Sequence, residues 1–354
     1  MVAPTPLMPD AFPAELTAVL EQLPSMKHGK LIRQILETLA RMMGREGDRL
    51  DWKILNSALQ DMERGFQTFY PYRHTRKITI FGSARLSRDR AEYQMAAEFA
   101  HRISQLGFMV MTGAGGGIMQ AGNEGAGADH SFGLNIQLPF EQGANPVMDG
   151  DPKLIDFKYF FTRKLFFLKE SDALALFPGG FGTQDEAFES LTLIQTGKAG
   201  PLPLVLVDRP GGDYWHNWDR YIRTQLLDHG LISPNDVHLY DIADNVETAC
   251  KLVADFYRVY HSSRYVGDQL VIRLKCPLSA RLLDQLNTEF SDLLAKGKIV
   301  ASETLPAEKG DETENLPRIT LHFNHRDFGR LRQMIHVINE RGLHSPESDH
   351  PEEK

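Results

Sequence analysis

The residues best placed to do chemistry form a glycine-rich segment that ends in an acid. Residues 178–186 are Pro-Gly-Gly-Phe-Gly-Thr-Gln-Asp-Glu, between an apolar run at 173–177 that predicts a buried strand and a pattern at 187–194 that predicts a helix. A glycine-rich turn between strand and helix leaves backbone N–H groups pointing outward, and the helix dipole adds positive potential. We therefore expect a phosphate-type anion site here, with the Glu186 carboxylate beside whatever the phosphate carries.

Glu186 also has a purely structural interpretation. Thr183 and Glu186 have the spacing of a capping box, with Thr183 as N-cap and Glu186 at the third helical position. An ordinary helix start does not need Gly179, Gly180 and Gly182 just before it, whereas close approach of a ligand to the backbone does. The two roles can coexist.

Arg163 and Lys164 are the candidate cations of this site. They follow Thr162, a candidate N-cap, so they are expected in the first turn of a helix, where cations oppose the helix dipole. One interpretation is a solvated surface pair. The other is that they face the phosphate or ribose of a ligand, since the arginine fork suits phosphate oxygens.

Two further turns could contribute. Residues 113–117, Gly-Ala-Gly-Gly-Gly, follow a predicted strand but match neither the dinucleotide fingerprint nor the ATPase loop. Such glycines can instead serve tight strand–helix packing, and Ser83 after the first strand can be a plain turn residue. The candidate ligand contacts in these turns are Gly82, Ser83, Gly115, Gly116, Gly117 and Met119.

Other catalytic chemistries have little support in the sequence. No His-x-x-x-His pair occurs, and His322 and His325 near Asp327 have the pattern of a solvated turn. Cys250 lies in an apolar helical pattern typical of a core position. There is no Gly-x-Ser-x-Gly motif, so a serine nucleophile has little support, and we predict neither a metal nor a cofactor.

The elements that must position these residues alternate between strand and helix from Lys77 to Tyr260. Predicted strands lie at 78–81, 108–111, 134–138, 159–161, 173–177, 202–207 and 237–240, and helices of suitable length lie between most of them. This order predicts an α/β fold with a Rossmann-like, doubly wound parallel sheet, whose ligands bind at the carboxyl ends of the strands.

The flanking regions predict additional units. Residues 1–70 have a helical pattern, with a loose start at 1–12, and residues 266–343 alternate in the order strand, helix, strand, strand, helix, which suggests a small, ferredoxin-like α+β domain. Within that domain, the polar residues 306–315 are expected to be a mobile loop. We expect the main domain at 71–265 and a disordered tail at 344–354.

Composition limits the class of protein. The 354 residues carry a net charge of −8, with 39 basic and 47 acidic side chains, which argues against a protein that coats nucleic acid. Two cysteines without metal-type spacing fit a reducing cytosol. With no apparent signal peptide and no apolar run of membrane length, the chain is expected to be cytoplasmic and free of membranes.

The segment at 178–186 resembles the signature of the LONELY GUY (LOG) family of nucleoside 5′-monophosphate phosphoribohydrolases. The Arg163-Lys164 pair stands where that family has Arg-Lys, residues 115–119 resemble its second turn, and residues 135–142 are similar to a bacterial branch. Further along the helix, four residues match the family pattern: Glu189, Thr192, Gln195 and Gly197. The similarity covers about half the chain, between Lys77 and Tyr260, because typical members lack the extensions at both ends.

The resemblance implies hydrolysis of the N-glycosidic bond of a nucleoside monophosphate to free base and ribose 5-phosphate. It implies catalytic roles for Glu186 and Arg163 and a homodimer or larger homo-oligomer. The substrate would be AMP-like or a cytokinin riboside monophosphate. The residues implied to bind it, besides the turn residues given above, are Lys164, Pro178, Gly179, Gly180, Gly182, Thr183 and Glu189.

Two other functions remain open on this fold. One is a non-catalytic nucleotide sensor with the C-terminal unit as transmitter, although a pure sensor would not need the acid at Glu186. The other is a relative that binds single-stranded DNA, which the negative net charge disfavours.

Overall fold

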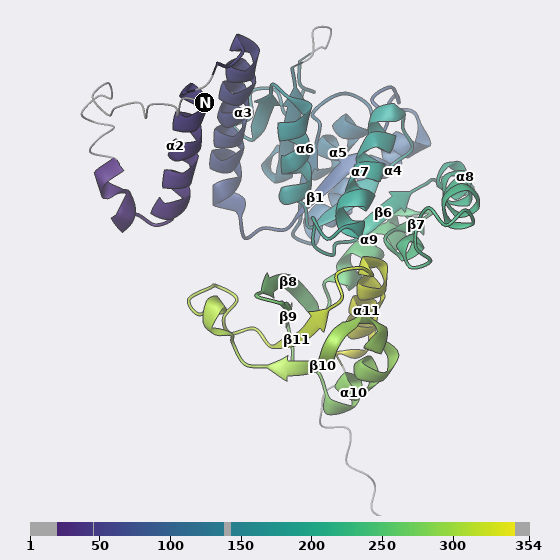
Figure 1. Cartoon of the computed structure of the whole chain (residues 1–354). Coiled ribbons are helices and arrows are strands. Elements are labelled where there is room, and N and C mark those ends of the chain that lie inside the picture. The colour runs from purple at the N-terminus through teal and green to yellow at the C-terminus, as the bar shows by residue number, and fades with distance from the viewer. Residues whose placement is uncertain (1–19, 45, 138–142, 344–354) are drawn as a thin grey trace, which may run out of the picture. The chain divides into compact units, whose positions relative to one another are not determined.

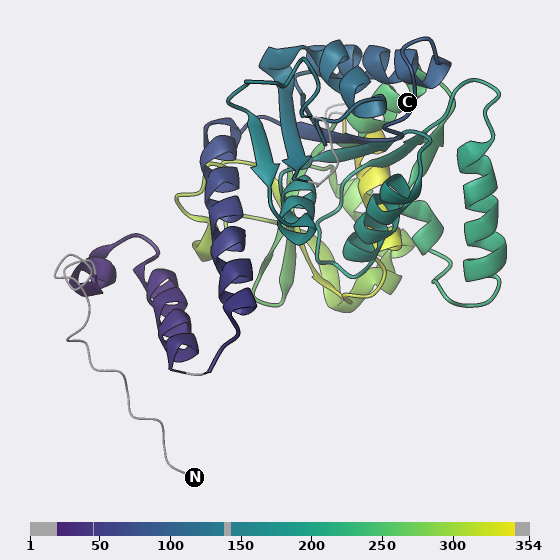
Figure 2. The same cartoon turned by 90° about the horizontal axis from the view of Figure 1, so that it is seen from above.

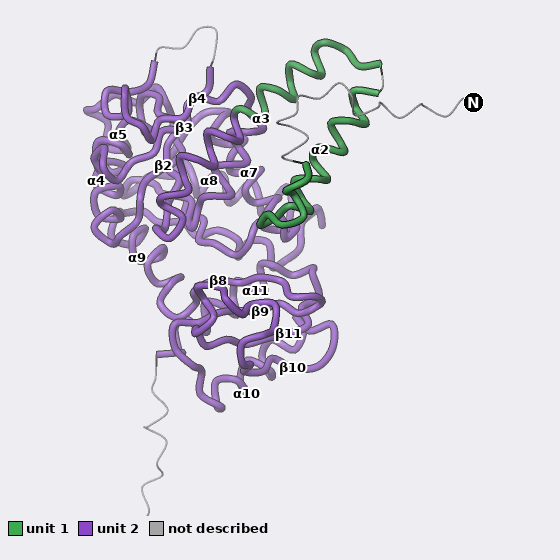
Figure 3. The backbone as a smooth tube through the Cα atoms, turned by 90° about the vertical axis from the view of Figure 1, so that its left-hand side faces the viewer, with its two compact units in different colours: residues 1–60 green, residues 61–354 purple. Residues whose placement is uncertain are grey.

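The computed structural model describes residues 20–44, 46–137 and 143–343, so the predicted loose start and tail lie outside the described residues. The chain divides into two compact units, residues 1–60 and 61–354 (Figure 3). The described part of the first unit is helical, as the sequence predicts: it holds α2 (Gly29–Met43) and the start of α3 (Arg49–Phe69). The boundaries predicted at 70 and 265 stay predictions.

The second unit contains a sheet of seven parallel strands, in the order β4-β3-β2-β1-β5-β6-β7. The chain winds outward from β1 to β4, returns to the other side of β1 with β5, and then winds outward again. The sequence order therefore reverses between β1 and β5, which is where a doubly wound sheet opens a crevice for ligands. The strands are β1 (Lys77–Phe81), β2 (Met109–Thr112), β3 (Ser131–Ile136), β4 (Leu154–Phe157), β5 (Ala173–Leu176), β6 (Leu204–Val207) and β7 (Asp241–Ala243).

Helices cover both faces of this sheet (Figures 1 and 2). On one side lie α4 (Ala91–Gln105) and α5 (Ile118–Ala126), and on the other α6 (Phe160–Lys169) and α7 (Phe181–Gln195). α8 (Tyr214–Tyr221) and α9 (Val246–Phe256) follow β6 and β7 in the chain. The central strands are buried along their whole length, as expected of parallel strands covered on both faces. The predicted α/β fold with a doubly wound parallel sheet is confirmed.

Two predicted strands are wrong. Tyr159 is the N-cap of α6 and the fourth strand ends before it, at Phe157. The aromatic residues at 159–161 favour strand locally, but the buried Asp61 carboxylate accepts hydrogen bonds from the backbone N–H groups of Lys158 and Tyr159 and fixes a helix start there. The seventh strand was predicted at 237–240, whereas a 3₁₀ turn occupies 236–238 and β7 begins at Asp241.

The C-terminal region forms the predicted small α+β unit around a four-stranded antiparallel sheet, in the order β10-β11-β9-β8. A ferredoxin-like sheet has the same spatial order. The difference is that the edge strand beside β9, which normally comes last in the chain, is here β8 and comes first. β8 is the strand that the sequence patterns miss. The elements are β8 (Tyr260–Val266), β9 (Gln269–Leu274), α10 (Ala280–Glu289), β10 (Leu294–Ser302), β11 (Arg318–Phe323) and α11 (Phe328–Arg341).

The segment expected to be a mobile loop, 306–315, is anchored instead. Glu308 is fully buried and accepts hydrogen bonds from Arg273 and Arg318, at 2.8 Å from the Arg273 Nε and 2.5 Å from an Arg318 terminal nitrogen. The local sequence pattern misses this anchor, because Arg273 lies 35 residues before Glu308 and Arg318 lies 10 residues after it, each on a strand. The loop is therefore tied to the sheet by buried charge.

Candidate functional site

The candidate site is a cavity of about 810 Å³ at the carboxyl ends of β1, β2 and β5. It lies at the point where the strand order reverses, and the three glycine-containing turns meet there with the start of α6. Ten predicted site residues line it: Gly82, Ser83, Gly115, Met119, Arg163, Gly179, Gly180, Gly182, Thr183 and Glu186.

The turn after β5 presents a helix N-terminus to this cavity. α7 begins at Phe181 with Gly180 as its N-cap, and the first helical hydrogen bond runs from Gln184 N–H to the Gly180 carbonyl. The N–H groups before it, at Phe181, Gly182 and Thr183, belong to the first turn and have no partner within the helix. This is the arrangement that binds anions at helix N-termini.

The capping box expected at Thr183 and Glu186 is wrong. Because α7 starts two residues before Thr183, the threonine is not the N-cap and lies buried inside the first turn. A Cβ at Gly179 would lie 2.1 Å from the Thr183 hydroxyl and 2.9 Å from the Ser83 nitrogen. Gly179 is thus required by close packing, and Glu186 is left one and a half turns into the helix without a capping role.

The three turns hold one another in place through backbone contacts. Ser83 donates its N–H to the Pro178 carbonyl at 3.1 Å and accepts a hydrogen bond from the Ile118 N–H at 3.0 Å. Gly117 has a φ of +61°, and a Cβ there would lie 2.2 Å from the Ser83 carbonyl oxygen. Pro178, Gly116 and Gly117 do not line the cavity, so they act as supports in this structure rather than as its walls.

A buried asparagine that the sequence patterns miss supports the second turn. Asn145 donates from its side-chain amide to the Gly115 carbonyl at 3.2 Å and to the Asn123 side chain at 3.0 Å, and its N–H donates to the Ala114 carbonyl at 2.7 Å. Ala114 has a φ of +57°, a conformation that non-glycine residues seldom adopt. No local signal marks Asn145, which lies 30 residues from Gly115.

Glu186 is a largely buried carboxylate, with its side chain 14% exposed. Burial raises its pKa above the usual glutamate value, and the nearby Glu189 raises it further, while Lys164 and Arg163 lower it. The net shift is upward, because burial outweighs the effect of the nearby cations. The carboxyl is thus ionised less readily than a solvated glutamate.

Lys164 is the shared cation. Its Nζ lies 2.8 Å from Asp185, 3.2 Å from Glu186 and in direct contact with Glu189. Burial alone would lower the lysine pKa, but the hydrogen bonds to Asp185 and Glu189 outweigh it and the pKa is raised. The amine therefore stays protonated. Lys164 and Arg163, which the sequence predicts as a pair, have different partners.

Arg163 points toward the sheet. Its Nε donates to the Leu134 carbonyl at 2.7 Å, its guanidinium lies 5.1 Å from the centre of the Phe167 ring, and a Cβ at Gly113 would lie 2.3 Å from a terminal nitrogen. The guanidinium therefore lines the cavity between the second turn and Glu186.

The helix that carries both cations is positioned by Asp61, another residue that local patterns miss. The predicted cap, Thr162, is instead the third residue of α6, so the cations begin just after the first three residues of the helix. Asp61 is fully buried and accepts a 2.7 Å hydrogen bond from the Thr162 hydroxyl, in addition to its two backbone contacts. A carboxylate at the N-terminus of α6 complements the helix dipole.

Tyr214 on α8 holds the turn after β5. Its hydroxyl donates to the Gly179 carbonyl at 2.6 Å and accepts from the Gln184 amide at 2.6 Å. Nothing in the sequence near Tyr214 indicates this contact, since the partner lies 35 residues away. The hydrogen bond stabilises the backbone of the anion-binding turn.

The described residues contain neither a metal-binding cluster nor a membrane-spanning helix. Within residues 20–44, 46–137 and 143–343 no cluster of histidine, cysteine or acidic side chains has the geometry to hold a metal ion. In the same ranges, no helix has the combined length and apolar character that crossing a membrane requires.

The fold and the cavity define a doubly wound α/β protein with an anion-binding turn and a buried acid. Residues 111–253 match the model of a family described as "Possible lysine decarboxylase". The chain is 30% identical over 165 residues to the cytokinin riboside 5′-monophosphate phosphoribohydrolase of Mycobacterium tuberculosis, which covers 46% of the chain and 84% of that relative. The chain belongs to this family, the LOG family that the signature at 178–186 predicts.

Solved structures of similar fold cover 51% of the chain. The protein TM1055 has 20% sequence identity and a TM-score of 0.36, with 98% of its chain covered. The molybdenum cofactor carrier protein of Chlamydomonas reinhardtii has 20% identity and a TM-score of 0.36, with 99% covered. DNA processing protein A of Helicobacter pylori has 15% identity and a TM-score of 0.36, with 82% covered.

Proposed function

We propose that the protein hydrolyses the N-glycosidic bond of a nucleoside 5′-monophosphate, releasing the free base and ribose 5-phosphate. The observation that carries this proposal is the placement of the buried Glu186 carboxylate on the wall of the cavity that the α7 N-terminus also lines. The curated relative in Mycobacterium tuberculosis bears the name of such an enzyme.

Substrate binding begins with the phosphate. The N–H groups at the start of α7 and the Ser83 hydroxyl offer donors, and the Arg163 and Arg85 side chains line the same cavity. A phosphate held at this turn directs the ribose along α7, whose next turn carries Glu186. The exposed aromatic side chain of Phe160 at the cavity offers surface for a planar base.

The chemical step breaks the bond between C1′ and the base nitrogen. Positive charge develops on the ribose as in glycoside hydrolysis, and an ionised carboxylate beside C1′ stabilises it. The bond between C1′ and the base nitrogen breaks, and the base nitrogen takes a proton from solvent. The Glu186 carboxylate orients a water molecule and accepts its proton as the water oxygen bonds to C1′, and the carboxyl then returns that proton to solvent. Arg163 binds the substrate and lowers the pKa of Glu186, which keeps more of the carboxylate ionised.

The alternative proposal is a nucleotide sensor that binds the same ligand without cleaving it. The turn after β5 would serve either function, because backbone amides bind phosphate without chemistry. A buried acid with a raised pKa is costly to maintain where no proton is transferred, and this favours the enzyme.

The experiment is an incubation of the full-length protein with AMP, GMP, CMP and a cytokinin riboside monophosphate, followed by chromatography for free base and an assay for ribose 5-phosphate. We expect equimolar base and ribose 5-phosphate from at least one nucleotide. Calorimetric binding of a nucleotide with no product would favour the sensor instead. If the protein neither binds a nucleotide nor releases a product, both proposals are wrong.

The remaining expectations on assembly and location are proposals too. Exposed apolar side chains on α7, Phe181 at 96% and Phe188 at 39% exposure, support a homodimer or larger homo-oligomer that covers them. Light scattering of the purified protein would test the oligomer, and a monomer at micromolar concentration would contradict it. The cytoplasmic location stays a prediction from the sequence.

A further inference from the structure

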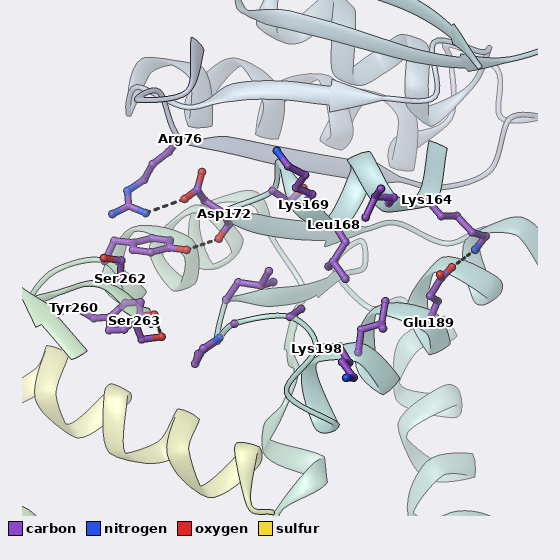
Figure 4. A pocket seen from close by; sticks show the side chains of 18 of the residues that line it. Arg76, Lys164, Leu168, Lys169, Asp172, Glu189, Lys198, Tyr260, Ser262 and Ser263 are labelled. Atoms are coloured by element: carbon purple, nitrogen blue, oxygen red, sulfur yellow. Dashed lines mark hydrogen bonds and ion pairs between the residues drawn. The ribbon is translucent and has the colours of Figure 1, made fainter. Parts of the chain in front are cut away.

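A second cavity, of about 720 Å³, lies beside the candidate site, between the parallel sheet and the C-terminal sheet (Figure 4). We call it the junction cavity. α6 and α7, the loop before β6 and strand β8 all contribute to it, and its volume falls in the range of small-molecule sites, about 300–1,000 Å³. Both cavities lie within the compact unit 61–354.

The charged side chains of the junction cavity favour an anion. Four cations and two carboxylates line it, in a chain whose net charge is −8: Arg76, Lys164, Lys169 and Lys198 against Asp172 and Glu189. Lys198 is exposed, and the part of the chain that the structure describes gives it no ion pair. Arg76 pairs with Asp172, Lys169 with Glu170 and Lys164 with three carboxylates, so among the described lining residues Lys198 is the cation that meets a ligand anion directly. The other cations become ligand contacts when the anion displaces a carboxylate from them.

Arg76 is held by several contacts at one end of the cavity. The Arg76 guanidinium lies 3.1 Å from Asp172, donates to the His261 carbonyl at 3.2 Å and stacks 3.6 Å from the centre of the Tyr257 ring. The hydroxyl of Ser262 lies at the same end. Burial lowers the pKa of His261, and the neighbouring Arg76, Lys275 and Arg273 lower it further.

The other end reaches the candidate active site. Figure 4 shows Lys164 and Glu189 in contact at the end opposite to Arg76. Lys164 lines the junction cavity and contacts Glu186, an acid on the wall of the candidate site, so the amine links the two cavities through that ion pair. Between the two ends the wall includes apolar side chains of Leu165, Leu168 and Leu193, which suit a ligand with an apolar or planar body.

We propose that the junction cavity is a second ligand site, which takes a small organic phosphate of about nucleotide size. Its phosphate lies against the lysines, and its body contacts both β8 of the C-terminal unit and the helices of the parallel-sheet domain. The bound anion competes with Glu189 and Glu186 for Lys164, so occupancy changes the rate of the reaction at Glu186. The binding does not depend on the proposed function, whereas this coupling rests on it.

The test of binding is calorimetry with ADP and fructose 1,6-bisphosphate as probes, on the full-length protein and two charge-reversal variants. Lys198→Glu changes an exposed side chain of the junction cavity, and Arg85→Glu changes an exposed side chain of the nucleotide cavity. We expect Lys198→Glu to lower the affinity of at least one probe for one class of binding sites, the junction cavity, about tenfold. We expect Arg85→Glu to leave that class unchanged. The proposal would be overturned if Lys198→Glu bound both probes as tightly as the unaltered protein does. It would also be overturned if all probe binding were lost in Arg85→Glu, since the probes would then bind in the nucleotide cavity alone.

The coupling is tested by base release from AMP at saturating probe. We expect the rate to change at least twofold in the unaltered protein, and the change to disappear in Lys198→Glu at the same probe concentration. A rate that does not respond, in a protein shown by calorimetry to bind the probe outside the nucleotide cavity, would overturn the coupling. If the unaltered protein releases no base at all, the proposed function fails while the calorimetry still decides the second site.

Discussion

Two buried carboxylates, Glu308 in the C-terminal unit and Glu186 in the candidate site, have opposite balances of charge. Glu308 has no exposed surface and lies between two arginines, so that two cations face one anion. Burial would raise its pKa, but the hydrogen bonds to Arg273 and Arg318 lower it below the usual glutamate value. At Glu186 burial raises the pKa, and Lys164, which opposes this effect, is shared among three carboxylates, so the pKa stays raised.

The difference separates a structural acid from a reactive one. Glu308 is held ionised with its oxygens occupied by arginine donors, so it has no capacity left to exchange protons. Glu186 is only partly compensated and lies on the wall of a cavity, which is how titratable groups at functional sites are commonly arranged. The number of cations per carboxylate, rather than burial alone, distinguishes the two.

The largest effect on stability is expected from Glu308→Gln. The change removes the anion between two arginines that stay buried, and breaking such a group costs about 3–5 kcal/mol. Urea unfolding would measure the loss of free energy of unfolding. Glu312→Gln in the same loop is the matched control, because that side chain is 69% exposed, and its change should stay within about 0.5 kcal/mol. Equal free energies of unfolding for the two variants would contradict the structural role of Glu308.

Arg163→Ala should lower kcat/KM for base release about 10- to 100-fold, which corresponds to about 1.4–2.7 kcal/mol. The variant loses the guanidinium that lines the nucleotide cavity and one of the cations that lower the pKa of Glu186. Steady-state kinetics with the preferred nucleotide would show it. Arg223→Ala serves as control, since Arg223 pairs with Asp219 away from the cavity. A change under twofold in Arg163→Ala would remove Arg163 from the reaction.

Lys164→Met sharpens the comparison through pH. Lys164 lowers the pKa of Glu186, so its removal raises that pKa further above the usual glutamate value. If the ionised carboxylate is the active form, kcat/KM falls as pH drops through this pKa, and the acidic limb of the profile should move to higher pH in the variant. A limb in the same position for Lys164→Met and the unaltered protein would show that Glu186 does not set it.

The smallest effect is expected from Tyr214→Phe. The loss of one hydrogen bond to the Gly179 carbonyl is worth about 0.5–1.5 kcal/mol, which should raise KM roughly two- to tenfold with little change in kcat. Tyr221→Phe on the same helix is the control, because its side chain is half exposed. An unchanged KM in Tyr214→Phe would mean that the turn does not need this support.

Residues close together in the sequence allowed the central part of the site to be predicted. The strands β1, β2, β5 and β6 follow from short apolar runs, and the turn after β5 follows from its glycines, because strand, turn and helix are contiguous there. The topology then brings the turns after β1 and β2 to the same edge of the sheet.

The supports of the site could not be predicted from local patterns. Asp61, Asn145 and Tyr214 act on partners about 30 to 100 residues away, through single hydrogen-bonding side chains that have no periodicity. The start of α6 was misassigned because aromatic residues favour strands unless a distant carboxylate caps the helix. Thr183 resembled an N-cap because the glycines hide the true start of α7.

The most direct test compares base release by the unaltered protein and by Glu186→Gln, with nucleotide affinity measured for both. The variant keeps the volume and hydrogen-bonding capacity of the side chain but cannot become a carboxylate. We predict a loss of at least about 1,000-fold in kcat with nucleotide affinity changed less than about fivefold, within the range of acid–base catalysis. Turnover by Glu186→Gln at the rate of the unaltered protein would contradict the assignment of Glu186 as the reactive acid.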